Sequence, residues 1–368
     1  MDLCIDLLIF KTRAIYYLFC LCQLYVFPIE LIHLIVEHYW NTLSIKNISL
    51  CCGPTHIILY NNNILTNTLK TCGLYEYQGG TNSVLGNQYD LIKNFNITNI
   101  VCGYHYHIIQ ANDKLYSCGV NNYGQLGLNH YVDIFDVPRQ IDFKKNVNDP
   151  FVIKKISCGC RHTMILTNYG LYGCGDNSFK QICLSHNKYN TLNKINIDNV
   201  LNISCGDFHT MIQTSNGYYL CGLNVNGQLG IQGIDYSQQL IKINISNIID
   251  VQCGPFYTAI NSVSGVYIYF DNKVQKIIHQ PFTISLCSFY YLSFLNNHIL
   301  YTYGKNKLKK TKQYIDHLSA IDIKDVIHID GHRDYIIIFT KTKIYFSGDS
   351  PHLRRFRNMF NQDIINNL

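Results

Sequence analysis

The sequence predicts an all-β protein built from seven copies of one repeat. A Cys-Gly pair, or a degraded form of it, recurs along the chain, and a second such pair follows each time after about sixteen residues, twenty in the first unit. A repeat of this length is one supersecondary unit, which must stack on its neighbours to bury its apolar face. The first members of the pairs are Cys52-Gly53, Cys102-Gly103, Cys158-Gly159, Cys205-Gly206, Cys253-Gly254, Cys287-Ser288 and Asp330-Gly331. The second members are Cys72-Gly73, Cys118-Gly119, Cys174-Gly175, Cys221-Gly222, Tyr269-Phe270, Tyr303-Gly304 and Ser347-Gly348.

The residue pattern of each unit predicts strands joined by a tight turn. In the fourth unit, strand-forming residues at 201–205, 210–214 and 218–221 are separated by a loop and by the turn Ser215-Asn216-Gly217. An Asn-Gly pair between β-rich runs is the strongest short hairpin signal. The third unit repeats the scheme, with its turn at Asn168-Tyr169-Gly170. We therefore expect every unit to be a small antiparallel sheet.

A glycine-rich string follows the second landmark at residues 119–127 and 222–230, with the pattern G-x-N-x-x-G-Q-L-G. Glycines at fixed offsets supply positive φ in tight connections, and the Leu between them anchors the loop to the core. Together with the upstream Cys-Gly-x-x-His, this string resembles the repeat of the regulator of chromosome condensation family. The resemblance implies a seven-bladed β-propeller over residues 46–368, closed between the first and last blades. Because units five to seven have lost the glycine-rich string, we expect their blades to be the least regular.

Residues 1–45 precede the repeats and form a separate, short α-helical segment in this prediction. The apolar stretch at 14–27 is shorter than a membrane-spanning helix needs, which argues against a membrane segment, and no membrane is the interpretation adopted. The residues after it resemble the first helix of an F-box, which implies docking to the adaptor of a cullin ubiquitin ligase. Two other interpretations stay open, namely an apolar helix packed on the propeller and a membrane segment. The docking residues would be Pro28, Glu30, Leu31, Ile32 and Ile35.

The sixteen cysteines are interpreted as buried thiols. Most of them are repeat landmarks beside a glycine, and free Cys is among the most buried residue types. The paired C-x₂₋₄-C spacing of a structural zinc site is missing from the sequence. We therefore predict no metal, no cofactor and no disulfide, with Cys102, Cys158, Cys205 and Cys253 as unpaired strand residues.

The sequence contains no recognisable catalytic motif. His56, His162 and His209 recur three residues after the landmark Gly, where the other units have Tyr106, Tyr257, Tyr291 and Asp334. One such residue per unit is typical of a structural repeat, and we expect each imidazole to bond the loops of its own blade. In the alternative, these histidines and Asp207 lie on a propeller face and contact a ligand. Catalytic chemistry needs unlike groups close together, and the sequence identifies none.

The predicted function is that of a non-enzymatic platform for protein interactions, linked to ubiquitin ligation through residues 1–45. The family resemblance implies an alternative, a guanine-nucleotide exchange factor for a Ran-like small GTPase. In that family acidic residues near the blade loops contribute to the partner face, and Asp207 is the single acid directly after a landmark Gly here. We therefore expect no exchange activity. The chain is predicted to be a monomer inside the cell, in the cytoplasm or nucleus.

The net charge of +6 is concentrated near the C-terminus. A lysine cluster there predicts either a solvated loop or weak nucleic-acid binding through phosphate contacts. Since family members bind chromatin, the second interpretation is kept as an alternative. The cluster comprises Lys305, Lys307, Lys309, Lys310 and Lys312.

Overall fold

The fold is a ring of four-stranded β-sheets. The structure, a computed structural model, describes residues 48–53, 56–61, 69–75, 83–84, 97–142, 152–280, 282–287, 291–296, 299–305, 314–321, 323–332, 335–340, 343–348 and 365–367. Every regular element in these ranges is a strand, so none of them is a helix that could cross a membrane. Residues 1–45, for which the sequence predicts a helical segment and a separate unit, lie outside the described residues.

The strands form one four-stranded sheet, or blade, per repeat. Blade 1 contains β1 (Ile48–Cys52), β2 (His56–Asn61), β3 (Leu69–Tyr75) and β4 (Ser83–Val84). Blade 2 contains β5 (Ile97–Cys102), β6 (Tyr106–Ala111), β7 (Lys114–Gly119) and β8 (Ile134–Gln140). Blade 3 contains β9 (Ile153–Cys158), β10 (His162–Thr167), β11 (Gly170–Asp176) and β12 (Lys188–Ile195). Blade 4 contains β13 (Val200–Cys205), β14 (His209–Thr214), β15 (Gly217–Leu223) and β16 (Tyr236–Lys242).

The remaining blades follow the same order along the chain. Blade 5 contains β17 (Ile248–Cys253), β18 (Thr258–Ser262), β19 (Gly265–Phe270) and β20 (Lys273–Ile278). Blade 6 contains β21 (Thr283–Cys287), β22 (Tyr291–Asn296), β23 (Ile299–Lys305) and β24 (Tyr314–Ile321). Blade 7 contains β25 (Val326–His332), β26 (Tyr335–Thr340), β27 (Ile344–Gly348) and β28 (Ile365–Asn367).

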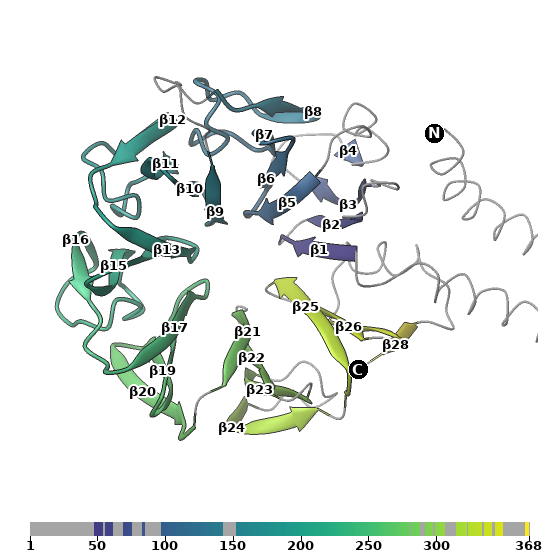
Figure 1. The fold of residues 1–368 in the computed structure, drawn as a ribbon, viewed down its shortest axis with the longest axis vertical. Helices are drawn as coiled ribbons and strands as arrows, with labels where there is room; N and C mark the ends of the chain where they lie inside the picture. Colours follow the sequence, from purple (N-terminus) through teal and green to yellow (C-terminus); the bar gives the residue numbers. More distant parts are fainter. Residues whose placement is uncertain are drawn as a thin grey trace, which may run out of the picture.

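The blades stand radially around a central axis, with the first strand of each blade innermost and the fourth at the rim (Figure 1). Each inner strand contacts the inner strand of the next blade, and β25 contacts β1, which closes the ring. The predicted all-β propeller is therefore confirmed. Each inner strand remains the edge of its own sheet, but ring closure packs it between the inner strands of the two neighbouring blades, and such short, protected edges are how propellers limit the edge-pairing hazard of open sheets.

Five blades are complete antiparallel sheets of four strands, not the seven equivalent blades that the sequence predicts. The exceptions are the two ends of the ring. In blade 1, β4 has only two residues, and in blade 7 the short strand β28 pairs with β27 in parallel. The expectation that blades 5 and 6 are irregular is wrong. Their strands pair fully because hairpin register, and not the glycine-rich string, sets the sheet.

Apolar cores lie between neighbouring blades. Ile165 and Ile156 of blade 3 pack with Ile108 and Leu126 of blade 2, and an equivalent cluster occupies the next interface. Because a second strand is covered on both sides, it needs apolar or satisfied residues at every position and not at alternate ones. The strand β10 is accordingly buried along its whole length, and its sequence, His-Thr-Met-Ile-Leu-Thr, contains only apolar residues and residues that can form hydrogen bonds.

The glycine-rich strings form loops that an asparagine side chain holds closed. Asn224 Oδ1 accepts the N–H of Leu229 at 2.9 Å, while its amide nitrogen donates to the carbonyls of Ile231 and Ile234. The same pattern occurs at Asn121 and Asn177. Each asparagine therefore satisfies the donors and acceptors of a loop that has no sheet partner.

Candidate functional site: the loop face of the propeller

In blades 2 to 6, whose strands are all antiparallel, the connections between strands one and two and between strands three and four emerge at the same end of the blade. We call this end the loop face. It carries residues 103–105, 120–133, 159–161, 177–187, 206–208 and 224–235. The opposite end, the turn face, carries the hairpin turns, including those at 168–169 and 215–216 that the sequence predicts.

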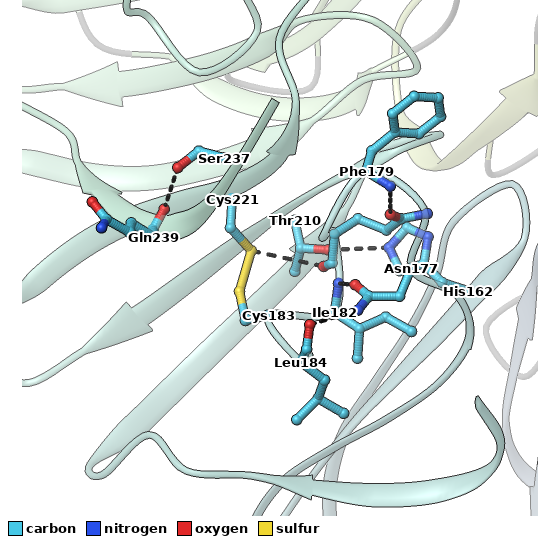
Figure 2. The surroundings of a disulfide bond; sticks show 11 residues. His162, Asn177, Phe179, Ile182, Cys183, Leu184, Thr210, Cys221, Ser237 and Gln239 are labelled. Atoms are coloured by element: carbon cyan, nitrogen blue, oxygen red, sulfur yellow. Dashed lines mark hydrogen bonds between the residues drawn. A yellow bond between two sulfur atoms is a disulfide. The ribbon is translucent and has the colours of Figure 1, made fainter. Parts of the chain in front are cut away.

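His162 and His209 lie between blades and are fully buried. Each imidazole Nε2 is 3.0 Å from the Thr Oγ1 of the following blade, Thr210 or Thr258 (Figure 2 shows the first pair). The expectation that they bond the loops of their own blade is therefore wrong. Burial lowers the pKa of both imidazoles to about 3, so they are neutral ties between blades and do not line the face.

The absence of a side chain at the landmark glycine leaves room for the imidazole ring. A Cβ on Gly206 would overlap Cε1 of His209 and the carbonyl oxygen of Gly254, and Gly159 is related to His162 in the same way. In blade 2 the position holds Tyr106, whose hydroxyl donates to the carbonyl of Gly159 in the next blade. The Cys-Gly-x-x-His motif is thus a packing motif.

Strand register assigns a different residue of blade 7 to the His column, the set of residues equivalent to His162 and His209. Tyr335 faces Gly348 just as His162 faces Gly175, so Tyr335, and not the predicted Asp334, is the equivalent residue in blade 7. The landmark there is shifted by one position as well. Asp330 therefore occupies the place of Ser157 and not that of Cys158.

The landmark thiols line a small cavity of about 110 Å³ at the propeller axis. Cys102, Cys158, Cys205 and Cys253 are unpaired, as predicted; Cys253 is buried, whereas the other three are half-buried and not buried as predicted. Burial raises the pKa of the Cys205 thiol to about 12, so it is protonated and unreactive at neutral pH. No group of three metal-ligating side chains occurs within the described ranges.

One pair of cysteines contradicts the prediction of free thiols. Cys183 and Cys221 form a disulfide, which joins the blade 3 loop to the third strand of blade 4 (Figure 2). Cys183 occupies the place of the last glycine of the string, which is Gly127 in blade 2. That place lies beside the second landmark cysteine of the next blade, because a Cβ on Gly127 would be 3.4 Å from Cys174 Sγ.

Asp207 lies on the loop face but is only 5% exposed. For two other predicted site residues the structure gives the position in a strand. His56 begins β2, opposite Gly73, and Lys305 ends β23. The remaining lysines of the cluster and the F-box-like residues 28–35 lie outside the described residues.

The loop face carries a group of cationic and aromatic side chains that the sequence interpretation missed. The guanidinium of Arg161 lies over the ring of Tyr123, with Cζ 4.4 Å from the ring centroid, and Nη1 donates to the hydroxyl of that residue at 2.7 Å. Cζ is also 5.8 Å from the centroid of Phe208, whose ring meets that of Phe179 edge to face. We call this group, with two further residues, the Arg161 cluster: Tyr123, Tyr131, Arg161, Phe179, Lys188 and Phe208.

Lys188 extends the cluster. Its ammonium lies 5.0 Å from the Tyr123 centroid and 4.8 Å from that of Tyr131, and it donates to the carbonyl of Asn122. The position of these residues within the repeat could have predicted their contacts. The fifth residue of the glycine-rich string meets the residue before the His column of the next blade, as the pairs Tyr123–Arg161 and Phe179–Phe208 show.

A groove of about 680 Å³ opens between the blade 4 loop and the outer strand β20. It forms because Asp271 and Asn272 make a two-residue hairpin where blades 2 to 4 have a long loop. Its lining residues are Gly230, Gln232, Asn272, Lys273, Val274 and Gln275.

The fold and loop face define a repeat β-propeller, and comparisons with known proteins agree. Residues 112–166 and 153–181 match models of the regulator of chromosome condensation (RCC1) repeat. The chain is 38% identical over 73 residues to the secretion-regulating guanine nucleotide exchange factor of Bos taurus, covering 20% of this chain and 15% of that protein. It is 37% identical over 90 residues to the ultraviolet-B receptor UVR8 of Arabidopsis thaliana, covering 24% of this chain and 19% of the receptor. The matched parts thus span less than a fifth of these relatives.

Solved structures share the fold over most of the chain. Human WBSCR16 superposes with a TM-score of 0.64 at 17% identity, covering 80% of this chain and 87% of that one. Prp20p from Saccharomyces cerevisiae, whose structure was described with its binding to Gsp1p and histones, gives a TM-score of 0.64 at 14% identity. That superposition covers 84% of this chain and 85% of Prp20p. Repeats of RCC1 type therefore occupy residues 112–181, within a propeller of RCC1-like fold.

Proposed function

We propose that this chain is a non-enzymatic platform of the RCC1 repeat family that binds a protein partner through its loop face. One observation carries the proposal. Of the eleven large apolar side chains that are exposed in the described part of the chain, seven lie at the loop-face end of their blades. These seven are Tyr131, Val132, Val225, Ile234, Tyr236, Phe270 and Val274.

Exposed apolar groups gathered on one side of a rigid scaffold are typical of a protein-binding surface. Five of the seven lie around the junction of blades 4 and 5, where the 680 Å³ groove also opens. The buried histidines also support a non-enzymatic role, because His162 and His209 are neutral and their side chains bond between blades. What the loop face offers a partner is contact area and charge. We place the protein in the cytoplasm or nucleus as part of this proposal.

Site-specific photocrosslinking tests the choice of face. A photoreactive residue replaces Val225 on the loop face in one variant and Val263 on the turn face in a matched variant; the two valines are 52% and 61% exposed. We expect the Val225 variant to capture a discrete protein partner in cells that the Val263 variant does not capture. Capture from Val263 alone, or from neither position, would contradict the proposal.

A second candidate function is nucleotide exchange on a Ran-like small GTPase. It is favoured by the similarity to a guanine nucleotide exchange factor and by the shared fold with Prp20p. Exchange requires tighter binding to the GTPase when its nucleotide is absent. Because Asp207 is buried, the loop face lacks an exposed acid directly after its landmark glycines in blades 2 to 5. We expect no acceleration of labelled-GDP release from Ran, and robust release would favour exchange over the platform.

The N-terminal part of the proposal concerns the division into residues 1–45 and 46–368. If the predicted helix at Pro28 to Ile35 docks a cullin adaptor, deleting residues 1–45 removes that adaptor from purified complexes and leaves the propeller folded. Retention of an adaptor by the shortened chain would contradict the F-box-like interpretation. A partner captured equally by both chains would assign binding to the propeller.

A further inference from the structure

The Arg161 cluster is built to present cations. Arg161 contacts two aromatic rings of different blades, and the hydroxyl of Tyr123 accepts from one of its five N–H donors. A guanidinium positioned in this way loses little side-chain freedom on binding, so a bidentate contact to an anion is gained at low entropic cost. Arginine with aromatic neighbours is also the composition typical of binding hot spots.

The positive charge of the cluster is not neutralised within the described residues. The carboxylate of Asp133 accepts the N–H of Asn121, and that of Asp176 accepts from the backbone and hydroxyl of Ser178. Both acids therefore serve their own loops, and no ion pair within 4 Å joins Arg161 or Lys188 to a described carboxylate. Lys188 is exposed, which leaves its ammonium open to a ligand.

We infer that the Arg161 cluster binds an acidic segment of the partner protein, rich in Asp or Glu; this inference rests on the proposed platform function. The carboxylates of such a segment would accept from the free edge of the Arg161 guanidinium and from Lys188. Nucleic acid is the less suitable occupant. Stacked bases need open aromatic faces, whereas both tyrosines already lie under the cations.

Fluorescence anisotropy with a short labelled peptide of alternating Glu and Ser tests this inference on the full chain. We expect saturable binding that weakens as salt is raised, and no binding of the same peptide with Gln in place of Glu. Arg161→Gln should weaken binding roughly tenfold, and Lys188→Gln about threefold. Lys194→Gln is the matched control, because Lys194 is an exposed lysine of the same blade beside the turn-face residue Gly170. It should leave affinity unchanged.

Three outcomes would overturn the inference: equal binding of the Gln peptide, equal losses in the Lys194 and Arg161 variants, or tighter binding of a labelled oligothymidylate than of the Glu peptide. The salt dependence of the unmodified chain keeps the test valid if a variant fails to fold. The two proposals fail separately. Partner capture from Val225 without binding of the Glu peptide would retain the platform and reject the acidic segment, whereas loss of both would reject both.

Discussion

The histidine column shows how one residue type acts at a blade interface. His162 and His209 are fully buried, and each reaches a threonine hydroxyl of the next blade. Desolvation disfavours the imidazolium, and the pKa of each imidazole falls from 6.5 to about 3. A base whose pKa is lower in the folded state binds fewer protons there than in the unfolded chain. Its contribution to stability is therefore present above pH 6.5 and is lost as the pH falls toward 3.

The unfolding free energy of the protein should accordingly fall between pH 7 and pH 5, by about 2 kcal/mol for each of these two histidines. Replacing both, His162→Gln and His209→Gln, should lower stability at pH 7 and make this pH dependence less steep, while His107, which is also buried with its pKa lowered to about 3, keeps part of it. Urea unfolding at the two pH values measures both effects. His130→Gln, in an outer loop, is the control for a His→Gln change as such. An equal slope in the double variant would refute the role of buried imidazoles.

At the scale of elements, the glycine-rich loops tie each blade to the next. The carbonyls of Gln125 and Gln228 accept from Thr163 and Thr258 of the following blade at 2.8 and 2.7 Å. Blade 3 departs from this string, because Lys180 and Cys183 adopt positive φ where the other loops have glycine. A β-carbon at positive φ costs about 1 kcal/mol. In the case of Cys183 the disulfide to Cys221 offsets this cost.

Cys183→Gly should therefore lower the unfolding free energy in oxidising buffer by about 2 kcal/mol, because it removes a cross-link that restricts the unfolded chain. In the presence of reductant the same variant should be about 1 kcal/mol more stable than the reduced natural chain, since glycine tolerates positive φ. Thermal unfolding with and without reductant measures this reversal. Cys253→Ala, which changes a free thiol, should respond to reductant as the natural chain does. A variant that keeps the same rank in both buffers would show that the cross-link contributes nothing.

At the scale of the whole molecule, closure of the ring uses a different group from the two junctions on either side of blade 4. Ser157 and Ser204 accept the backbone N–H of the landmark cysteine in the following blade. Between blades 7 and 1 this acceptor is the carboxylate of Asp330, whose Oδ2 lies 2.8 Å from the N–H of Cys52. Burial raises the pKa of Asp330 from 3.8 to about 7 despite its hydrogen bonds to the backbone.

An acid with a raised pKa binds more protons in the folded state, so its contribution to stability is present below pH 3.8 and is lost as the pH rises through 7. Asp330→Ser introduces the uncharged acceptor that Ser157 and Ser204 provide on either side of blade 4. Relative to the natural chain, this variant should gain roughly 1–2 kcal/mol as the pH rises from 5 to 8, a discounted value because Asp330 is only half-buried. Denaturant titrations across this range measure the gain. The exposed Asp198→Ser is the control for an Asp→Ser change as such, and a flat difference for Asp330→Ser would contradict the raised pKa of Asp330 at the ring closure.

The sequence by itself determined the repeat, the hairpin turns and the all-β class. These depend on residues close together in the chain, such as Asn216-Gly217, whose conformational preferences are local. It also predicted which positions are equivalent in each blade. Where a unit has lost the repeat motif, as at Asp330-Gly331, comparison of the repeats misplaced the His column by one residue. Strand pairing in the structure identified the correct residue.

Only the tertiary structure decided what each equivalent residue contacts. Stacking places the column of one blade against the next blade, so His162 meets Thr210 across 48 residues and Cys183 meets Cys221 across 38. The Arg161 cluster arises in the same way, from loops of three blades. A repeat period states which residues share a position, whereas the angle and closure of the ring decide which positions meet, because the energy of those contacts comes from burial between units that are distant in sequence.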